Sequence, residues 1–385
     1  MSRLEKLIAE LCPEGVEFKE LGLLIRINFG ERITKLENSG TLYPVYGGGG
    51  ESFRTDNFNR EDEYVVSRFA MSERCVRRVD GQFWMLDSGF TFDPIDDSID
   101  KDFIAYLLFS MQAEIYACSS QGAQKNLKTE AFKQLRLPVP PMEIQLEIVK
   151  VLDAFTELEA ELEAELEARR AQYQYYRDAL LAFSDQDIRW AAMAELGEFI
   201  RGRRFTKADY VEDGVPCIHY GEIYTRYGTA ADAAISHVRS EMAASLRYAK
   251  PGDVVVTDVG ETVEDVGKAV AWVGNENVAI HDHCYAFRHS MNPKFVSYCM
   301  QTSAFIAEKA KYVARTKVNT LLIGGFSKIR IPVPPLEEQE RIVAILEKFD
   351  ALVNDISVGL PAEIAERRQQ YAYYRDRLLT FKEAA

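Results

Sequence analysis

Two stretches of the chain, 194 residues apart, read as copies of one another. Residues 135–145 and 329–339 share the pattern Leu/Ile-Arg-Leu/Ile-Pro-Val-Pro-Pro-x-Glu-x-Gln. Each copy leads into a long helical pattern that closes on Tyr-x-Tyr-Tyr-Arg-Asp, at residues 173–178 and 371–376. A repeat of this length exceeds the roughly 20–50 residues of a solenoid unit. The chain therefore duplicates a whole domain followed by a helix, and an internal pseudo-two-fold repeat is expected.

The length and composition indicate a globular protein of two or three domains, since 385 residues carry an apolar fraction of 47%. No apolar run reaches the roughly 18 residues of a membrane span, and the first residues lack the apolar segment of a secretory leader. The six cysteines are scattered without a Cys-x-x-Cys pair, which is typical of reduced thiols rather than of disulfides or a zinc site. We expect a cytoplasmic protein with no membrane partner.

The net charge of −14 argues at first against a nucleic-acid partner. Its distribution weakens that objection. The two helical segments, 142–183 and 336–385, together hold 11 basic and 20 acidic residues, which is −9 of the total. The rest of the chain is close to balanced, with 35 basic and 40 acidic residues. Basic faces on the larger segments therefore stay compatible with DNA.

The two larger segments have similar sequence patterns, with short β-branched runs, many glycines and little sustained helical period. These patterns predict two mixed α/β globules. The expected elements are strands at 64–67, 253–257 and 269–273 and helices near 101–116 and 294–312. The glycine run at 47–50 is expected to be loop, because glycine weakens helix and strand alike.

The segments after the two proline runs are predicted to be helices of roughly 40 residues each. Proline suits a first helical turn, and the apolar residues that follow step by 4 and 3, the spacing of a coiled-coil seam. Three Thr/Ala-Glu-Leu-Glu units fill residues 156–167. Gly359 and Pro361 predict a kink or a short interruption in the second helix. An antiparallel pair suits the connectivity, because the chain returns through the second globule; the alternative is two helices packed separately on their own globules.

The expected fold class is α+β, with two mixed α/β globules separated by a long antiparallel two-helix coiled-coil spacer. The predicted segments are 1–141 for the first globule, 142–183 for the central spacer helix, 184–335 for the second globule and 336–385 for the C-terminal spacer helix.

No convincing catalytic motif is present in the sequence. Residues 260–269 loosely resemble a P-loop, but six residues separate the glycines and Ala269 stands where Ser or Thr should bind Mg²⁺. His281, His283 and Cys284 suggest a metal site, but on a strand the thiol would point away from the two imidazoles. Polar residues entering a strand are the favoured interpretation. The chain is therefore expected to be non-catalytic, with no metal or cofactor of its own.

Recognition of DNA is the remaining possibility, because basic and amide-bearing clusters recur in both globules. Lys and Arg contact phosphates, Arg also reads guanine, and Asn or Gln reads adenine. The candidates for DNA contact are Arg74, Arg77, Arg78, Gln121, Gln124, Lys125, Asn126 and Lys128 in the first globule and Arg201, Arg203, Arg204, Lys207, Lys309, Lys311, Arg315, Lys317 and Asn319 in the second. For any single residue, the alternative is an ordinary solvated side chain.

The helices are candidates for binding protein partners, because tyrosine is enriched at interface hot spots. The alternative role of the tyrosines is packing at the end of the coiled coil. The predicted partner-binding residues are Gln145, Tyr175, Tyr176, Arg177, Gln339, Tyr373, Tyr374 and Arg375.

The chain resembles, over essentially its full length, the specificity subunit of type I restriction–modification systems, most like the IC group. The duplicated proline runs, the Tyr-x-Tyr-Tyr-Arg-Asp helix ends, the tandem Glu-Leu-Glu units and the opening residues 1–13 carry the resemblance. It implies that each globule is a target-recognition domain for one half of an asymmetric, bipartite double-stranded DNA target. It also implies that the helices set the gap and dock two methyltransferase subunits.

In the implied complex, restriction subunits join, and the assembly is an adenine-DNA methyltransferase and ATP-dependent endonuclease. AdoMet, ATP and Mg²⁺ would then belong to the partner subunits. Three alternatives stay open: a recognition subunit of another restriction class, a scaffold that joins two proteins without binding DNA, and an enzyme that uses His281 and His283.

Overall fold

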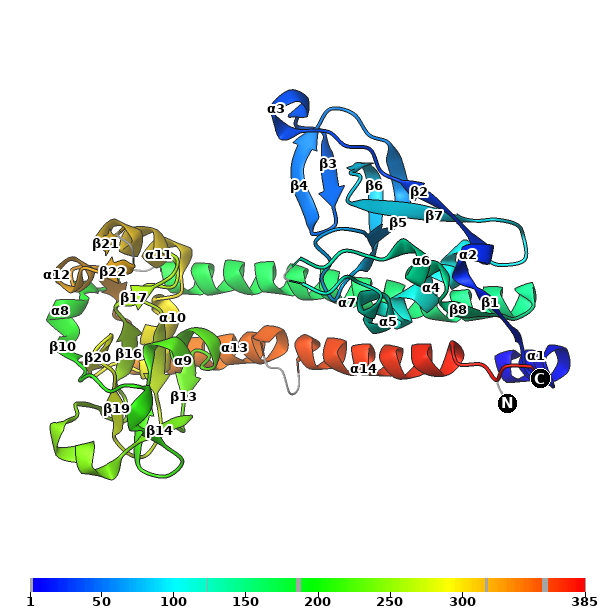
Figure 1. The fold of residues 1–385 in the computed structure, drawn as a ribbon. Helices are drawn as coiled ribbons and strands as arrows, with labels where there is room; N and C mark the ends of the chain where they lie inside the picture. The colour runs from blue at the N-terminus through cyan, green and yellow to red at the C-terminus, as the bar shows by residue number, and fades with distance from the viewer. Residues whose placement is uncertain (1–2, 123, 185–187, 316–317, 355–358, 385) are drawn as a thin grey trace. The chain divides into compact units, whose positions relative to one another are not determined.

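The computed structural model describes residues 3–122, 124–184, 188–315, 318–354 and 359–384 (Figure 1). It divides into two compact units, residues 1–162 with 364–385 (unit 1) and residues 163–363 (unit 2). Each unit thus combines one globule with part of the central helix and one C-terminal helix. No helix among the described residues is long and apolar enough to cross a membrane.

Unit 1 is built on a mostly antiparallel sheet with short helices against it. Its strands are β1 (Glu17–Glu20), β2 (Ile25–Phe29), β3 (Tyr43–Gly47), β4 (Gly50–Thr55), β5 (Arg60–Ser67), β6 (Val76–Met85), β7 (Gly89–Pro94) and β8 (Arg136–Val139). Its short helices are α1 (Arg3–Leu11), α2 (Leu21–Leu24), α3 (Lys35–Asn38), α4 (Lys101–Ser110), α5 (Gln112–Ala117) and α6 (Thr129–Lys133). Among the described residues the main sheet has the order β2-β7-β5-β6-β3-β4, and β1 pairs with β8. Its core is aromatic, with Phe90, Phe92, Phe103 and Phe132 fully buried.

Unit 2 divides its strands among smaller sheets. The strands are β9 (Trp190–Ala192), β10 (Gly197–Arg201), β11 (Tyr210–Val211), β12 (Val215–Ile218), β13 (Ala230–Ala231), β14 (Ser236–Val238), β15 (Tyr248–Ala249), β16 (Val254–Thr257), β17 (Val259–Gly260), β18 (Ala269–Trp272), β19 (Val278–Ile280), β20 (Cys284–His289), β21 (Val313–Ala314), β22 (Asn319–Leu321) and β23 (Arg330–Pro332). The helices are α8 (Met193–Leu196), α9 (Tyr220–Thr225), α10 (Pro293–Cys299), α11 (Ser303–Lys309) and α12 (Ile323–Phe326), with 3-10 turns η1 (Lys207–Asp209), η2 (Ser240–Ser245) and η3 (Ala310–Tyr312). In the described part, the sheet orders are β10-β20-β16-β18-β13, β11-β14-β12-β19-β15, β17-β22-β21 and β23-β9.

The strands and helices expected within the globules are present as β5, β16 and β18, and as α4, α5, α10 and α11. The glycine run at 47–50 is only partly the loop that was predicted. Gly47 and Gly50 are paired strand ends, and the turn between β3 and β4 is confined to Gly48 and Gly49. Gly50 has a φ of 121°, so glycine is needed there to restart the strand without strain.

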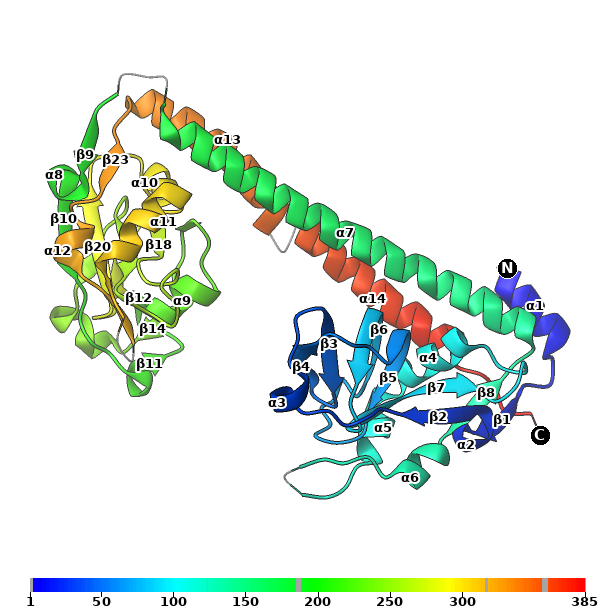
Figure 2. The same ribbon diagram turned by 90° about the horizontal axis from the view of Figure 1, so that it is seen from above.

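Three helices follow the proline runs: α7 (Met142–Ala182), α13 (Leu336–Asn354) and α14 (Leu360–Leu378). In unit 1, Phe155 of α7 stacks on Tyr374 of α14 with ring centroids 5.6 Å apart. In unit 2, Tyr173 and Tyr176 of α7 stack on Phe349 of α13 at 6.4 and 5.6 Å. Both views show α7 beside each partner helix, and the pairing within each unit is antiparallel (Figures 1 and 2). The predicted fold class is therefore confirmed, and the second helix is interrupted where Gly359 and Pro361 predicted.

A buried glutamine joins each globule to its long helix. The Gln145 amide is fully buried and accepts a hydrogen bond from the Asp100 N–H at 2.8 Å. It also donates to the Ser98 and Pro140 carbonyls at 3.0 and 2.7 Å. Asp100 in turn caps α4 by accepting from the Phe103 N–H. The amide therefore fixes the start of α4 against the start of α7.

Unit 2 repeats this clamp with matching atoms. Gln339 is 3% exposed, accepts from the Asn292 N–H at 2.9 Å and donates to the Pro334 carbonyl at 2.8 Å. Asn292 caps α10 through the N–H groups of Lys294 and Phe295. The duplicated Pro-Pro-x-Glu-x-Gln pattern thus encodes a structural clamp, which we call the glutamine clamp. The predicted partner-binding role of Gln145 and Gln339 is corrected, because both amides are buried and bonded within the fold.

Replacing Gln145 or Gln339 by alanine should lower the free energy of unfolding by about 2–4 kcal/mol, because buried N–H and C=O groups lose their partners. Urea unfolding of the full chain, followed by circular dichroism, measures the change. Glu143→Ala, an exposed position in the same turn, is the matched control and should stay within about 0.5 kcal/mol. Equal stability of all three variants and the parent would contradict the clamp.

Candidate nucleic-acid interface

The basic segment at residues 201–207 leaves β10 through a glycine that no other residue could replace without a shift. A Cβ at Gly202 would lie 2.1 Å from the His281 carbonyl oxygen and 2.3 Å from that of Ile280. The Gly202 N–H donates to the Cys284 carbonyl at 2.9 Å. Arg201, Arg203, Arg204 and Lys207 are exposed around this fixed point. The glycine therefore holds a cationic loop close against the entrance of β20.

The first globule has the same arrangement at Gly30. A Cβ there would lie 2.3 Å from the Leu86 carbonyl oxygen and 2.4 Å from that of Met85. The Gly30 N–H donates to the Gly89 carbonyl at 3.2 Å. The two glycines begin related segments, Gly-Glu-Arg-Ile-Thr-Lys at 30–35 and Gly-Arg-Arg-Phe-Thr-Lys at 202–207. The duplication therefore extends into the globules themselves.

Two further backbone hydrogen bonds complete a frame that is the same in both units. In unit 1 the Arg68 N–H donates to the Ser88 carbonyl, and the Leu127 N–H donates to the Arg68 carbonyl, both at 2.8 Å. In unit 2 the Asp258 N–H donates to the His283 carbonyl at 3.0 Å, and the Leu321 N–H to the Asp258 carbonyl at 2.7 Å. Together with the glycine bond, these define what we call the three-bond frame. It brings loops from distant parts of the chain to one place on each globule.

The predicted amide-bearing loops run into this frame in both units. Ser119 pairs with Leu127 in unit 1, and Val313 pairs with Leu321 in unit 2. Each pair closes a hairpin loop that carries candidates for DNA contact. Asn126 accepts a hydrogen bond from the Ala70 N–H at 3.4 Å, and the Asn319 amide donates to the Glu261 carbonyl at 2.8 Å. The two asparagines therefore hold the hairpins close to Arg68, which directly follows β5, and to Asp258, which directly follows β16.

Most of the predicted DNA-contact residues lie at the surface. Their contact with DNA stays a prediction. The exposed ones are Arg74, Arg78, Gln121, Gln124, Lys128, Arg201, Arg203, Arg204, Lys207, Lys311 and Arg315, and the half-buried ones are Arg77, Lys125, Asn126 and Asn319. Lys317 lies outside the described residues.

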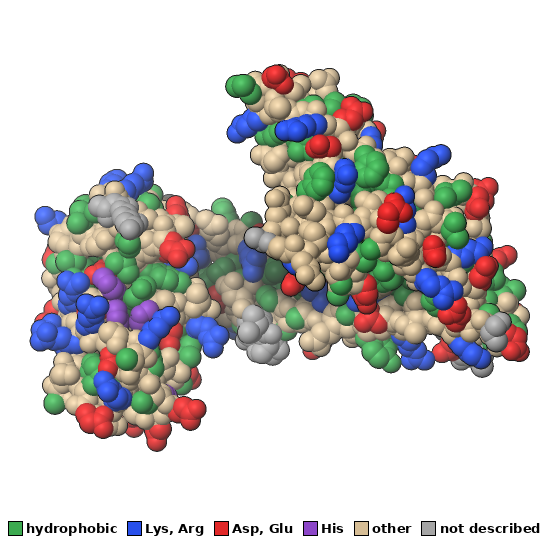
Figure 3. All heavy atoms as spheres, viewed as in Figure 1, with side chains coloured by type: hydrophobic (Ala, Val, Ile, Leu, Met, Phe, Trp, Pro, Cys, Tyr) green, Lys and Arg blue, Asp and Glu red, His purple; other side chains and the backbone are tan. Residues whose placement is uncertain are grey.

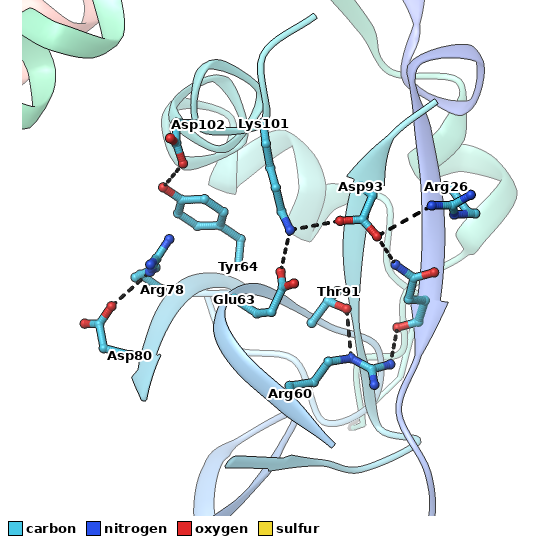
Figure 4. Close-up of polar contacts among 11 residues, drawn as sticks. Arg26, Arg60, Glu63, Tyr64, Arg78, Asp80, Thr91, Asp93, Lys101 and Asp102 are labelled. Atoms are coloured by element: carbon cyan, nitrogen blue, oxygen red, sulfur yellow. Dashed lines mark hydrogen bonds and ion pairs between the residues drawn. The ribbon is translucent and has the colours of Figure 1, made fainter. Parts of the chain in front are cut away.

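Several of these cationic side chains already make hydrogen bonds or ion pairs within the protein. The Arg77 guanidinium donates to the Gly48 carbonyl at 2.6 Å and to the Ser67 hydroxyl at 2.8 Å, which holds the β3–β4 hairpin. Arg78 lies over the Tyr64 ring and donates to Asp80 at 2.9 Å (Figure 4). Lys311 pairs with Glu308. For Arg77 and Arg78 these contacts favour structural roles.

Lys309 is corrected from a phosphate contact to a buried structural residue. It is 2% exposed, and its ammonium group donates to the Glu264 carbonyl at 2.9 Å. Burial lowers the pKa of Lys309 to about 8, against the opposing effect of the Glu264 and Asp265 carboxylates. A group enclosed in this way does not reach a phosphate.

Unit 2 also carries a histidine cluster beside the basic loop, visible as purple side chains among blue ones in Figure 3. His281 is 6% exposed and contacts the Phe205 carbonyl at 3.1 Å. Burial lowers the pKa of His281 to about 4, so its ring is neutral at pH 7. His283 is more exposed and bonds Asp258 at 2.9 Å. Among the described residues, no group of three or more His, Cys, Asp or Glu is placed to hold a metal ion.

The tyrosines at the helix ends form the same surface twice. Tyr175 is 69% exposed beside Tyr176, and Tyr373 is 60% exposed beside Tyr374, with ring centroids 5.5 and 5.4 Å apart. One ring of each pair, Tyr176 or Tyr374, also stacks on the partner helix. The other ring, Tyr175 or Tyr373, is mostly exposed. Arg177 and Arg375 lie less exposed, over the Tyr173 and Tyr371 rings.

Sequence reasoning missed Phe29, Arg68, Asp258 and Arg247, which all contact or lie beside the frame. Arg247 donates to the Arg201 carbonyl at 3.1 Å and adds a cation to the basic loop. The repeated Gly-x-Arg-x-Thr-Lys segment was the signal that could have located the frame. Arg68 and Asp258 leave no such signal, because only folding brings them to it.

The comparison with known protein families shows the same duplication of the chain. The profile described as "Type I restriction modification DNA specificity domain" matches residues 13–168 and 190–366. A putative type I restriction enzyme specificity subunit of Haemophilus influenzae is 28% identical over 98% of this chain and 98% of its own length. The EcoR124I/EcoR124II specificity subunit of Escherichia coli is 30% identical over 72% of this chain and 70% of its own.

Solved structures agree with the fold. The type I restriction–modification S subunit from M. genitalium aligns with a TM-score of 0.57 at 18% identity, covering 95% of this chain and 96% of that one. A chain from a structural study of complex assembly in the type I R-M system aligns with a TM-score of 0.61 at 16% identity, over 95% and 98% of the two chains.

The buried Lys309 predicts a rise in stability with pH. Its pKa is about 8 in the folded chain and about 10.4 when unfolded, so the unfolded state binds more protons between these values. Stability should therefore increase by roughly 1 kcal/mol from pH 7.5 to 9. Urea unfolding at both pH values measures this increase. Lys309→Met should flatten it, and an equal pH slope in that variant would show that Lys309 is not its source.

Proposed function

The chain belongs to the type I restriction–modification DNA specificity family, and from that premise we propose how its two globules and its helices work. It is the non-catalytic DNA-recognition subunit of such a system, as its relatives are named specificity subunits. Its partners are DNA and the methyltransferase and restriction subunits of the system. We place it in the cytoplasm, and its motifs favour the IC group.

Each globule reads one half of a bipartite double-stranded DNA target. The observation that carries this is the three-bond frame, which occurs once in each unit and holds exposed cations and amide-bearing hairpins at the surface. Two copies of one frame suit two half-sites. Because the side chains on the frames differ, the two half-sites should be unlike and the whole target asymmetric.

The long helices set the gap between the half-sites and dock two methyltransferase subunits. Support comes from α7, which is a continuous helix of 41 residues, and from the duplicated tyrosine pairs. Each pair presents one ring with most of its surface exposed, which suits an interface anchor. AdoMet, ATP and Mg²⁺ are assigned to the partner subunits.

Methylome sequencing tests this function. A host that expresses this chain with its neighbouring methyltransferase gene should carry a bipartite, asymmetric methylated motif with a fixed gap. Deleting the gene for this chain should abolish that motif, because the methyltransferase alone lacks the target-recognition domains. A motif that persists without this chain would reject the assignment.

Deleting residues 160–163 should shorten the gap by one to two base pairs and leave both half-sites unchanged. The deletion removes one four-residue unit, about 6 Å of helix, against about 3.4 Å per base pair. It also moves Leu166 into the place of Leu162, both nearly buried, so the apolar seam stays almost in phase. The same methylome measurement reads the result. Altered half-sites around an unchanged gap would contradict a spacer role.

A further inference from the structure

The two three-bond frames carry different side chains at matched positions. The residue before the frame glycine is Phe29 in unit 1 and Arg201 in unit 2. The residue whose backbone makes two of the frame bonds is Arg68 in unit 1 and Asp258 in unit 2. The cationic side chain of unit 1 is thus replaced by an anionic side chain in unit 2, at a matched backbone position. The two side chains also differ in burial, since Arg68 is half-buried and Asp258 is buried.

In unit 1 the Arg68 guanidinium lies on aromatic rings. It is 5.0 Å from the centroid of the Phe29 ring and 4.6 Å from that of Phe69. The Phe29 side chain is itself 45% exposed. Among the described residues, no hydrogen bond or ion pair engages the Arg68 guanidinium. Its N–H edge is therefore held flat and free, as bidentate contact with guanine requires.

In unit 2 the matched Asp258 is buried and instead organises its neighbours. Asp258 is 4% exposed. Its carboxylate accepts a hydrogen bond from the His283 Nδ1–H at 2.9 Å and pairs with the Arg201 guanidinium at 3.5 Å. Arg201 also donates from Nε to the Asp282 carbonyl at 2.9 Å. The His283 and Arg201 side chains are 40% and 51% exposed. A single carboxylate thus fixes two surface side chains without reaching the surface itself.

The Asp258 contact also decides what His283 offers. With Nδ1 donating to the carboxylate, Nε2 is the ring nitrogen left for a base, and it acts as an acceptor when the ring is neutral. An acceptor takes a hydrogen bond from the amino group of adenine or cytosine, whereas Arg201 supplies donors for guanine or phosphate. Unit 2 therefore presents an acceptor and donors, whereas unit 1 presents donors against an apolar ring.

We propose that the frame side chains are the specificity-determining residues of the two half-sites. Arg68, supported by Phe29, reads a base of the first half-site. Arg201 and His283 read bases of the second, and Asp258 is a positioning residue that does not touch DNA. This inference rests on the proposed function and assigns its target contacts to residues.

The test is methylome sequencing of hosts that express the methyltransferase gene with single variants of the full chain. Arg68→Ala should reduce discrimination at one position of the first half-site by about tenfold or more, with the second half-site unchanged. Asp258→Asn, His283→Ala and Arg201→Ala should relax the second half-site only. Asp213→Asn, an exposed carboxylate in the β11–β12 turn, is the matched control and should preserve the whole motif.

His283→Ala and Arg201→Ala change side chains that reach the surface. These two variants therefore test base discrimination in the second half-site even where Asp258→Asn impairs folding. Variants that keep the parent motif at full discrimination would overturn the inference and leave the proposed function standing. Equal loss of methylation at all sites with unrelaxed half-sites would also overturn it, because a merely structural role predicts that result. Absence of any bipartite motif with the parent chain would reject the proposed function and the inference together.

Discussion

The glutamine clamp is the interaction on which the rest of the structure depends. Gln145 and Gln339 each tie the N-terminus of a globular helix to the proline-led start of a long helix. Because each amide is buried, its bonds do not exchange with water, and the direction in which the long helix leaves the globule is fixed. A subunit that measures DNA spacing with a helix needs a rigid joint at each globule. The clamp supplies this joint twice, with matching atoms.

The duplication separates what must stay constant from what must differ. The clamp, the three-bond frame and the tyrosine pairs recur with nearly identical geometry in both units. Backbone groups make the frame, so its shape does not depend on the side chains that it carries. Arg68 and Asp258 therefore occupy matched backbone positions with opposite charge, within the same pattern of backbone hydrogen bonds. This arrangement allows two unlike half-sites to be read by two copies of one scaffold.

The sequence predicted the parts of the fold that repeat and are periodic. The proline runs, the apolar seam and the interruption near Gly359 located the helices and their antiparallel pairing. The function of the glutamines was misjudged, because a polar residue in a repeated motif suggests a contact surface, and only the structure shows that Gln145 is buried. Lys309 was misassigned for a related reason, since its burial near Gly267 and the Glu264 carbonyl depends on distant segments. The frame residues were missed because hydrogen bonds far apart in sequence bring them together.

The most direct measurement of the central claim is a structure of the complex of this chain with its methyltransferase subunits on target DNA. The account predicts that each three-bond frame faces base edges of one half-site. Arg68 should lie within hydrogen-bond distance of a base in the first half-site, and Arg201 or His283 in the second. Frames that face away from the DNA, with the bases contacted from another surface of the globules, would contradict the account.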